Sequence, residues 1–208
     1  MKQVGLYFGS FNPIHNGHLM VANYAIEHFN LDEVHFIVSP QNPFKEQKDL
    51  LDIDDRLMLA SYATIDNKKF YVNQIEKTLP KPSYTSNTLK HICEGTKNCE
   101  FYMIIGLDVF LTLDTWKDVE YILTHNIIVF PRVKTDNDEN PLDLFNNKLK
   151  QINEKFNIDS KIIYAKNAII NNISSTFIRN EIKNNKSIKY YVSDKIIDLI
   201  KSKKLYLK

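Results

Sequence analysis

Residues 4–18 read VGLYFGSFNPIHNGH: an apolar run that stops at Gly9, a turn around Pro13, and the histidines His15 and His18. Beyond them, residues 19–29 carry apolar side chains at helical spacing. The stretch therefore predicts a strand over 4–8, a tight loop, and a helix over 16–29. A second apolar run at 34–38 completes a right-handed parallel strand–helix–strand unit.

The same alternation continues along the chain. Further apolar runs predict strands at 70–75, 101–105, 126–130 and 162–164, and helical spacing recurs within 57–63, 85–94, 141–156, from about 174, and within 192–204. This pattern predicts an α/β fold with a doubly wound, Rossmann-like parallel sheet and helices on both faces. We interpret residues 1–208 as a single domain with a C-terminal helical portion from about 174.

Composition excludes several classes of protein. The formal net charge of +2 indicates neither a nucleic-acid nor a membrane partner, and no segment approaches the ~20 apolar residues that span a bilayer. Cys93 and Cys99 lack CxxC spacing, so we interpret them as unpaired thiols of a reducing compartment. The N-terminal apolar run is too short for a signal peptide. We therefore expect a cytoplasmic protein, and a homo-oligomer is compatible with the sequence.

The loop after the first strand has the features of a phosphate site. Ligands of doubly wound sheets bind beyond the carboxyl ends of the strands. Gly9 permits close backbone approach, Pro13 stiffens the loop, and the helix start near Gly17 offers free N–H groups to an anion. His15 and His18 add directional donors, which indicates a polyphosphate. Because GxGxxG, a Gly-Lys-Ser/Thr loop and further ligands at metal spacing are all missing, neither a redox dinucleotide, a kinase-type loop nor a metal site is indicated.

A second candidate anion site lies near the other end of the chain, in the stretch ISSTFIR at 173–179. Ser174 or Ser175 can cap a helix, Thr176 adds a hydroxyl, and Arg179 shares a helix face with Ser175. In isolation, the stretch is also compatible with an ordinary capped helix and a solvated arginine. Two such sites suit a triphosphate in which one phosphorus is attacked while pyrophosphate leaves.

These residues resemble a known superfamily. His15-Asn16-Gly17-His18, preceded by 9–13, and the stretch 173–179 are similar to the HxGH and ISSTxIR signatures of the α/β nucleotidyltransferases. Ser83-Tyr84-Thr85, the stretch from Gly106 to Lys117, and the loop 39–45 further resemble the nicotinate-nucleotide adenylyltransferase family, and the similarity covers nearly the whole chain. The resemblance implies the nucleotidyltransferase fold and an enzyme of NAD biosynthesis. It would transfer AMP from ATP to nicotinate mononucleotide, with magnesium, giving deamido-NAD and pyrophosphate.

The resemblance also implies individual roles. His15, His18 and Arg179 would be catalytic, and magnesium would be held mainly by phosphates rather than by dedicated protein ligands. ATP would be bound by residues of both motifs and of two later loops, namely Gly9, Ser10, Phe11, Gly17, Lys45, Gly106, Asp108, Ser174, Ser175 and Thr176. The mononucleotide would be bound by Asn12, Ser83, Tyr84, Thr85, Trp116 and Arg132, with Trp116 stacking on the nicotinate ring. For Asp108 a helix cap, and for Trp116 a core position, are the alternatives.

The sequence departs from the family pattern at three places. Asn12 stands where the family often has aspartate, Phe44 replaces a loop histidine, and the basic residue common ahead of Ser83 is missing, with Lys81 as a substitute. An adenylyltransferase that accepts nicotinamide mononucleotide, alone or as well, is therefore the first alternative. The others are a pantetheine-phosphate adenylyltransferase, which lacks the segments around Tyr84 and Trp116, a cytidylyltransferase, and a non-catalytic nucleotide-binding protein.

Overall fold

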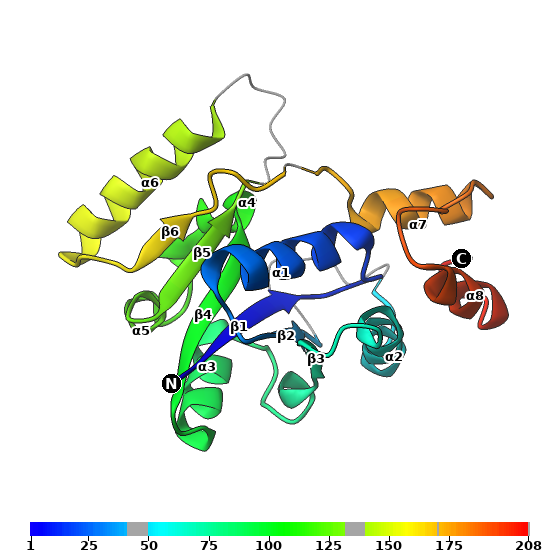
Figure 1. Ribbon diagram of the computed structural model, residues 1–208, viewed down its shortest axis with the longest axis horizontal. Coiled ribbons are helices and arrows are strands. Elements are labelled where there is room, and N and C mark those ends of the chain that lie inside the picture. The colour runs from blue at the N-terminus through cyan, green and yellow to red at the C-terminus, as the bar shows by residue number, and fades with distance from the viewer. Residues whose placement is uncertain (41–49, 132–139, 170, 208) are drawn as a thin grey trace.

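The sheet is parallel throughout and follows the strand order β3-β2-β1-β4-β5-β6 (Figure 1). The computed structural model describes residues 1–40, 50–131, 140–169 and 171–207. Within them the strands are β1 (Lys2–Gly9), β2 (Glu33–Val38), β3 (Phe70–Asn73), β4 (Cys99–Gly106), β5 (Asn126–Phe130) and β6 (Ile162–Tyr164). The winding direction reverses between β1 and β4, the point at which such sheets bind ligands.

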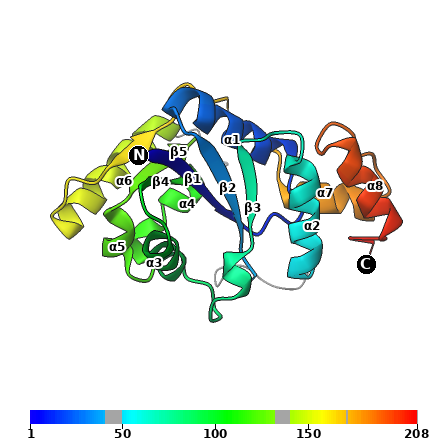
Figure 2. The same ribbon diagram turned by 60° about the horizontal axis from the view of Figure 1, so that its bottom comes forward.

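Helices cover both faces of this sheet (Figures 1 and 2). One hydrophobic core lies under α1 (Asn16–Phe29), α2 (Ile53–Thr64), α7 (Ser175–Lys183) and α8 (Asp194–Ser202). The other lies under α3 (Thr85–Gly95), α4 (Leu107–Phe110), α5 (Val119–Leu123) and α6 (Pro141–Phe156). The predicted doubly wound α/β sheet with helices on both faces is confirmed.

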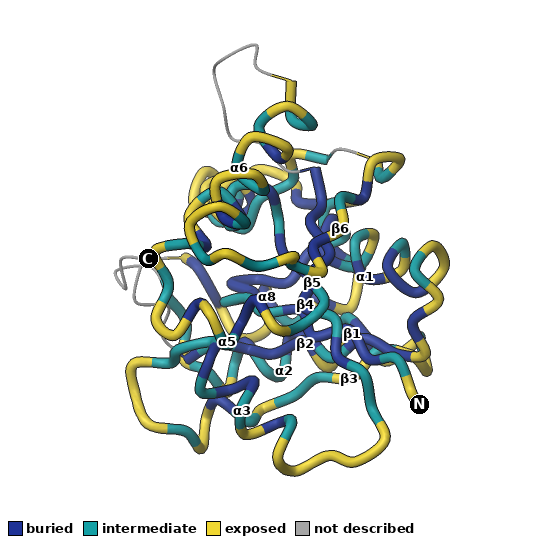
Figure 3. Tube along the Cα trace, turned by 90° about the vertical axis from the view of Figure 1, so that its left-hand side faces the viewer, coloured by how far each residue is buried: buried dark blue, intermediate teal, exposed yellow. Residues whose placement is uncertain are grey.

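Strand β4 illustrates why the strands appear as continuous apolar runs. Phe101, Met103 and Ile105 contribute to one core, while Ile104 points to the other, because side chains alternate between the faces of a strand. Figure 3 shows the central strands buried between more exposed helices. A sheet buried on both faces needs apolar residues at both sets of positions.

The element boundaries differ from the predicted ones in a few places. The third strand ends at Asn73 rather than at Ile75, because the Asn73 side chain accepts the backbone N–H of Ile75 at 2.9 Å and begins the turn η1 (Ile75–Lys77). Helices α4 and α5, and the 3₁₀ turn η2 (Leu113–Thr115), fill a stretch where no element was predicted. No helix within the described ranges is long and apolar enough to cross a membrane.

Candidate active site

A cavity of about 750 Å³ opens beyond the carboxyl ends of β1, β4 and β5, where the winding reverses. Its wall combines residues of both predicted phosphate motifs with residues of the two later segments. The predicted site residues that line it are Gly9, Ser10, Phe11, Asn12, His15, Gly17, His18, Ser83, Tyr84, Thr85, Gly106, Asp108, Trp116, Ser174, Ser175, Thr176 and Arg179. Lys45 and Arg132 lie outside the described residues.

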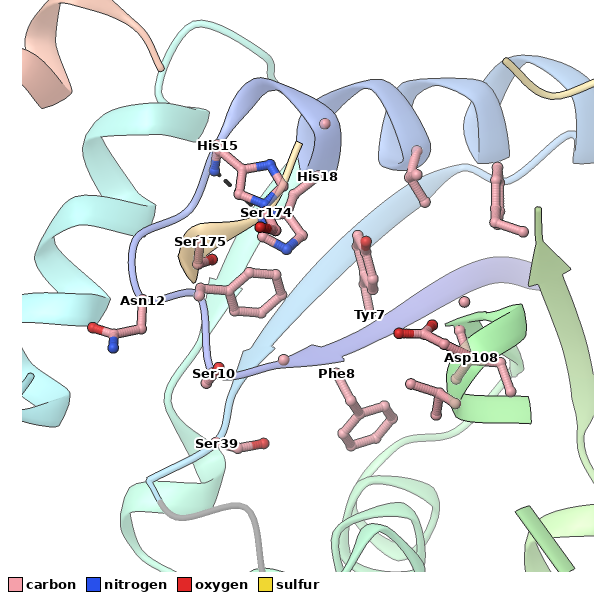
Figure 4. Close-up of a pocket in the computed structure, with 18 of the residues that line it drawn as sticks. Tyr7, Phe8, Ser10, Asn12, His15, His18, Ser39, Asp108, Ser174 and Ser175 are labelled. Carbon is pink, nitrogen blue, oxygen red and sulfur yellow. Dashed lines mark hydrogen bonds between the residues drawn. The ribbon is translucent and has the colours of Figure 1, made fainter. Parts of the chain in front are cut away.

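The two histidines stack on each other at the start of α1. Their ring centroids are 3.6 Å apart with an interplanar angle of 26°. The backbone N–H of His15 donates to Nδ1 of His18 at 3.2 Å (Figure 4). Because Nδ1 accepts this bond, neutral His18 carries its proton on Nε2, which makes Nε2 a hydrogen-bond donor. The edge-on ring of Phe11, 5.0 Å from His18 between centroids, packs against this pair.

Two glycines in this region leave room for neighbouring side chains. A Cβ at Gly9 would come within 2.9 Å of the Phe11 ring, and one at Gly17 would collide with the side-chain oxygen of Asn171. The sequence explained Gly9 by close approach of a ligand, which stays a prediction; in the structure both glycines are also required by packing within the protein. Asn171 also lines the cavity and was not among the predicted site residues.

Side chains of the second motif, at 173–179, donate hydrogen bonds to backbone carbonyls of the loop at 9–13. Ser175 Oγ donates to the carbonyl of Pro13 at 2.8 Å, and Arg179 Nη1 donates to the carbonyl of Asn12 at 2.9 Å. Ser174, not Ser175, is the cap of α7, since its hydroxyl accepts the Phe177 N–H at 3.1 Å. The motif at 173–179 therefore serves both as a wall of the cavity and as a support for the loop at 9–13.

Asn12 is oriented toward the C-terminal segment. Its Oδ1 accepts from the hydroxyl of Tyr206 at 3.0 Å and from the N–H of Leu51 at 3.3 Å. Figure 4 shows the amide directed away from the two histidines. Contact of Asn12 with a mononucleotide stays a prediction, while its contact with Tyr206 joins residues 194 positions apart in the sequence.

A buried arginine, absent from the predicted site, holds the neighbouring loops. Arg56 is 1% exposed, and among the described residues its hydrogen-bond acceptors are all backbone carbonyls. Nε binds Leu51, Nη1 binds Ser10 at 2.8 Å and Ser39 at 2.7 Å, and Nη2 binds Pro40 at 3.0 Å. Arg56 thus ties the segment after β1 to the segment after β2.

The cavity also has a wall formed by the start of α3. Tyr84 occupies the N-cap position, and the ammonium of Lys117 lies 4.5 Å from the centroid of its ring. Trp116, next to Lys117, donates its indole N–H to Thr112 Oγ1 at 3.4 Å. Trp116 is half-buried: it lines the cavity and also packs against the core under α3 to α6, so stacking on a nicotinate ring stays a prediction.

Two carboxyl groups line the same cavity. Glu76 is 1% exposed and accepts from Thr88 Oγ1 at 2.9 Å, and burial raises the pKa of its carboxyl. Asp108 lies in the first turn of α4, which Gly106 precedes as N-cap, so the cap alternative is wrong for Asp108. Its Oδ1 is buried and has no hydrogen-bond partner among the described residues. Figure 4 shows it across the cavity from His18.

Comparisons with known proteins agree with this arrangement. The cytidylyltransferase-like family model matches residues 6–181. A probable nicotinate-nucleotide adenylyltransferase of Cytophaga hutchinsonii is 40% identical, with 98% of each chain covered. Its counterpart in Flavobacterium psychrophilum is 41% identical over 99% of this chain and 100% of that relative. A solved structure, Plasmodium falciparum nicotinic acid mononucleotide adenylyltransferase complexed with NaAD, has a TM-score of 0.73, 21% identity, and coverage of 99% and 98%.

Fold, cavity and family model together define a nucleotidyltransferase of the cytidylyltransferase-like class. Within this class, the sequence identity of about 40% to relatives covered over 98–100% of their length identifies the family. The chain belongs to the nicotinate-nucleotide adenylyltransferase family.

Proposed function

We propose that this protein transfers AMP from ATP to nicotinate mononucleotide, releasing pyrophosphate and deamido-NAD. The observation that carries the proposal is the convergence of both phosphate motifs and of the Tyr84 and Trp116 segments on one cavity. The histidines and α7 form one part of its wall, where a triphosphate would bind. The apolar faces of Trp116 and the start of α3 form another, where a pyridine ring would bind.

The reaction we propose is an in-line displacement at the α-phosphorus of ATP. An oxygen of the mononucleotide's 5′-phosphate forms the new bond to phosphorus, and the bond to the bridging oxygen of pyrophosphate breaks. The attacking phosphate is already an anion at neutral pH, so no general base is needed. Catalysis then depends on positioning and on stabilising the charge that develops.

The residues act in this scheme as donors to phosphate. His18 donates from Nε2 to the α-phosphate, since its Nδ1 accepts the His15 N–H. His15, stacked on His18, orients the triphosphate. Thr176 in the first turn of α7 and Arg179 one turn further along bind the departing phosphates, and the free N–H groups at the start of the helix also favour an anion.

We propose that magnesium accompanies the triphosphate. The described residues contain no group of three or more His, Cys, Asp or Glu side chains that could hold a metal ion. Magnesium commonly binds through phosphates and one or two carboxylates, and Asp108 supplies a buried carboxylate oxygen in the cavity wall. These residues fit an ion that enters with the nucleotide, which would neutralise phosphate charge.

A pyrophosphate-release assay with ATP, magnesium and a panel of acceptors tests the proposal. The acceptors are nicotinate mononucleotide, nicotinamide mononucleotide, phosphopantetheine and a control without acceptor. We expect the fastest release with nicotinate mononucleotide. Strong preference for the amide would support the first alternative, and no release with any acceptor would support a non-catalytic nucleotide-binding protein.

Substitution of His18 tests the mechanism. Removal of one donor to a developing charge commonly lowers turnover by ~10²-fold to 10³-fold, so we expect His18→Ala to lose at least this much with its fold intact. His28→Ala is the matched control, because His28 lies on the same helix but stacks on Tyr24. Turnover of His18→Ala near that of His28→Ala would rule out the assigned role.

A further inference from the structure

The positive side chains of the cavity lie in different parts of its wall. Among the described lining residues, the lysine and arginine side chains are those of Lys117 and Arg179. Arg179 belongs to α7, on the triphosphate side of the proposed site. Lys117 follows Trp116 and lies over Tyr84 at the start of α3. The cation on the pyridine side is therefore Lys117.

The charge of Lys117 is available to a ligand. Its ammonium lies 4.5 Å from the ring centroid of Tyr84, and the side chain is exposed at the cavity. Within the described residues Lys117 forms no ion pair within 4.0 Å; neighbouring Asp118 pairs with Lys90 at 3.1 Å and interacts with the charge of Lys117 at longer range. A lysine held over an aromatic face keeps its ammonium hydrogens free to donate.

A buried carboxyl in the same wall of the cavity explains why an acidic ligand would need a cation there. Glu76 is a buried carboxyl that lines the cavity and bonds to Thr88 of α3, three residues beyond Thr85. When ionised, it disfavours a second negative group bound nearby. The nicotinate ring carries a carboxylate, whereas the nicotinamide ring carries a neutral amide. A neighbouring positive charge therefore favours only the acid.

We propose that Lys117 is a specificity-determining residue, whose ammonium pairs with the ring carboxylate and so favours the acid mononucleotide over the amide. This inference rests on the proposed function. The flexible lysine stem allows the ammonium to remain above Tyr84 while it donates to an anion on the ring beside Trp116. The segments at 83–85 and 116–117 thereby act together on one substituent of the substrate.

Lys117→Met tests the inference, because methionine retains an apolar stem against Tyr84 but lacks the charge. We compare kcat/KM for nicotinate and nicotinamide mononucleotide at saturating ATP and magnesium, in low and high salt. We expect kcat/KM for the acid to fall about tenfold, mainly through KM, since a charged hydrogen bond is lost, while the amide changes little. Where amide turnover is too slow, its inhibition constant against the acid replaces kcat/KM.

Two further variants serve as controls. Lys97→Met removes an exposed lysine that lies beyond the end of α3 and does not line the described cavity, so the acid-to-amide ratio should stay unchanged. Lys117→Arg keeps the charge and should retain most of the preference. The acid should also lose its salt-dependent KM in Lys117→Met.

The outcomes separate this inference from the proposed function. An unchanged acid-to-amide ratio in Lys117→Met, or an equal shift in Lys97→Met, overturns the role of Lys117 while the wild-type activity stands. If the wild-type protein uses neither mononucleotide, the proposed function fails and the inference fails with it. A wild-type protein that prefers the amide also overturns it.

Discussion

Replacement of Arg56 by lysine should destabilise the protein through the loops beside the cavity. The arginine makes four hydrogen bonds to carbonyls of Ser10, Ser39, Pro40 and Leu51 while 1% exposed. Lysine keeps the charge, but a single ammonium on a shorter stem cannot reach carbonyls that are bound by Nε, Nη1 and Nη2 of a planar fork. We expect about two of the bonds to be lost.

The magnitude follows from these lost contacts. Bonds from charged donors contribute roughly 1.5–3 kcal/mol each, so two lost bonds cost at least about 3 kcal/mol. For a chain of this size, each kcal/mol shifts the melting temperature by about 2–4 °C, which gives a decrease of about 6–12 °C. Turnover should also fall, because the carbonyl of Ser10 belongs to the loop at 9–13.

Calorimetry and urea unfolding measure this effect, and the pyrophosphate assay follows turnover. Lys195→Met is the control, since it removes an exposed ion pair with Asp66 and should cost less than about 1 kcal/mol. A decrease in the melting temperature of Arg56→Lys no larger than that of the control would refute the argument that the planar fork of Arg56 holds these loops.

Two other predictions concern single contacts. Tyr206→Phe removes the hydroxyl bound to Asn12, so we expect a loss of about 1 kcal/mol in thermal unfolding and a lower kcat than in Tyr190→Phe, whose ring is 81% exposed. Equal kcat values would contradict this. The ammonium of Lys148 holds the pKa of Asp114 below its usual range. The pair therefore stabilises the fold above about pH 4, the ordinary aspartate range, and loses that contribution as pH falls through the lowered pKa. Asp114→Asn should be less stable than wild type at pH 7, and the difference should shrink in acid; a constant difference across unfolding curves would oppose this.

The sheet and the phosphate motifs could be predicted because their signals are local. Each strand that is buried on both faces gives a continuous apolar run, and the helices that follow repeat apolar residues on one face. The short helices α4 and α5, of four and five residues, were missed because they contain too few turns to show a period.

The side chains that hold the loops around the cavity could not be predicted, because their contact partners are distant in the sequence. Arg56 lies beside Asp54 and Asp55 on α2 and resembles a solvated helical cation, yet its Nη1 binds a carbonyl 46 residues away. The sequence gives no signal for a side chain that binds main-chain oxygens. Asn171 lies outside the regular elements and shows no period, so nothing in the sequence indicates that it lines the cavity beside Gly17.

The contacts that hold the loop at 9–13 have a consequence for how the protein is made. The loop leaves the ribosome before its partners: the carbonyls of Asn12 and Pro13 are bound by residues 167 and 162 positions later, and the Asn12 amide by one 194 positions later. A growing chain can pair β1 with β2 long before these contacts exist. Nucleotide therefore cannot assist the early folding of a nascent chain, and stabilises the protein only after residues 175–206 have been synthesised.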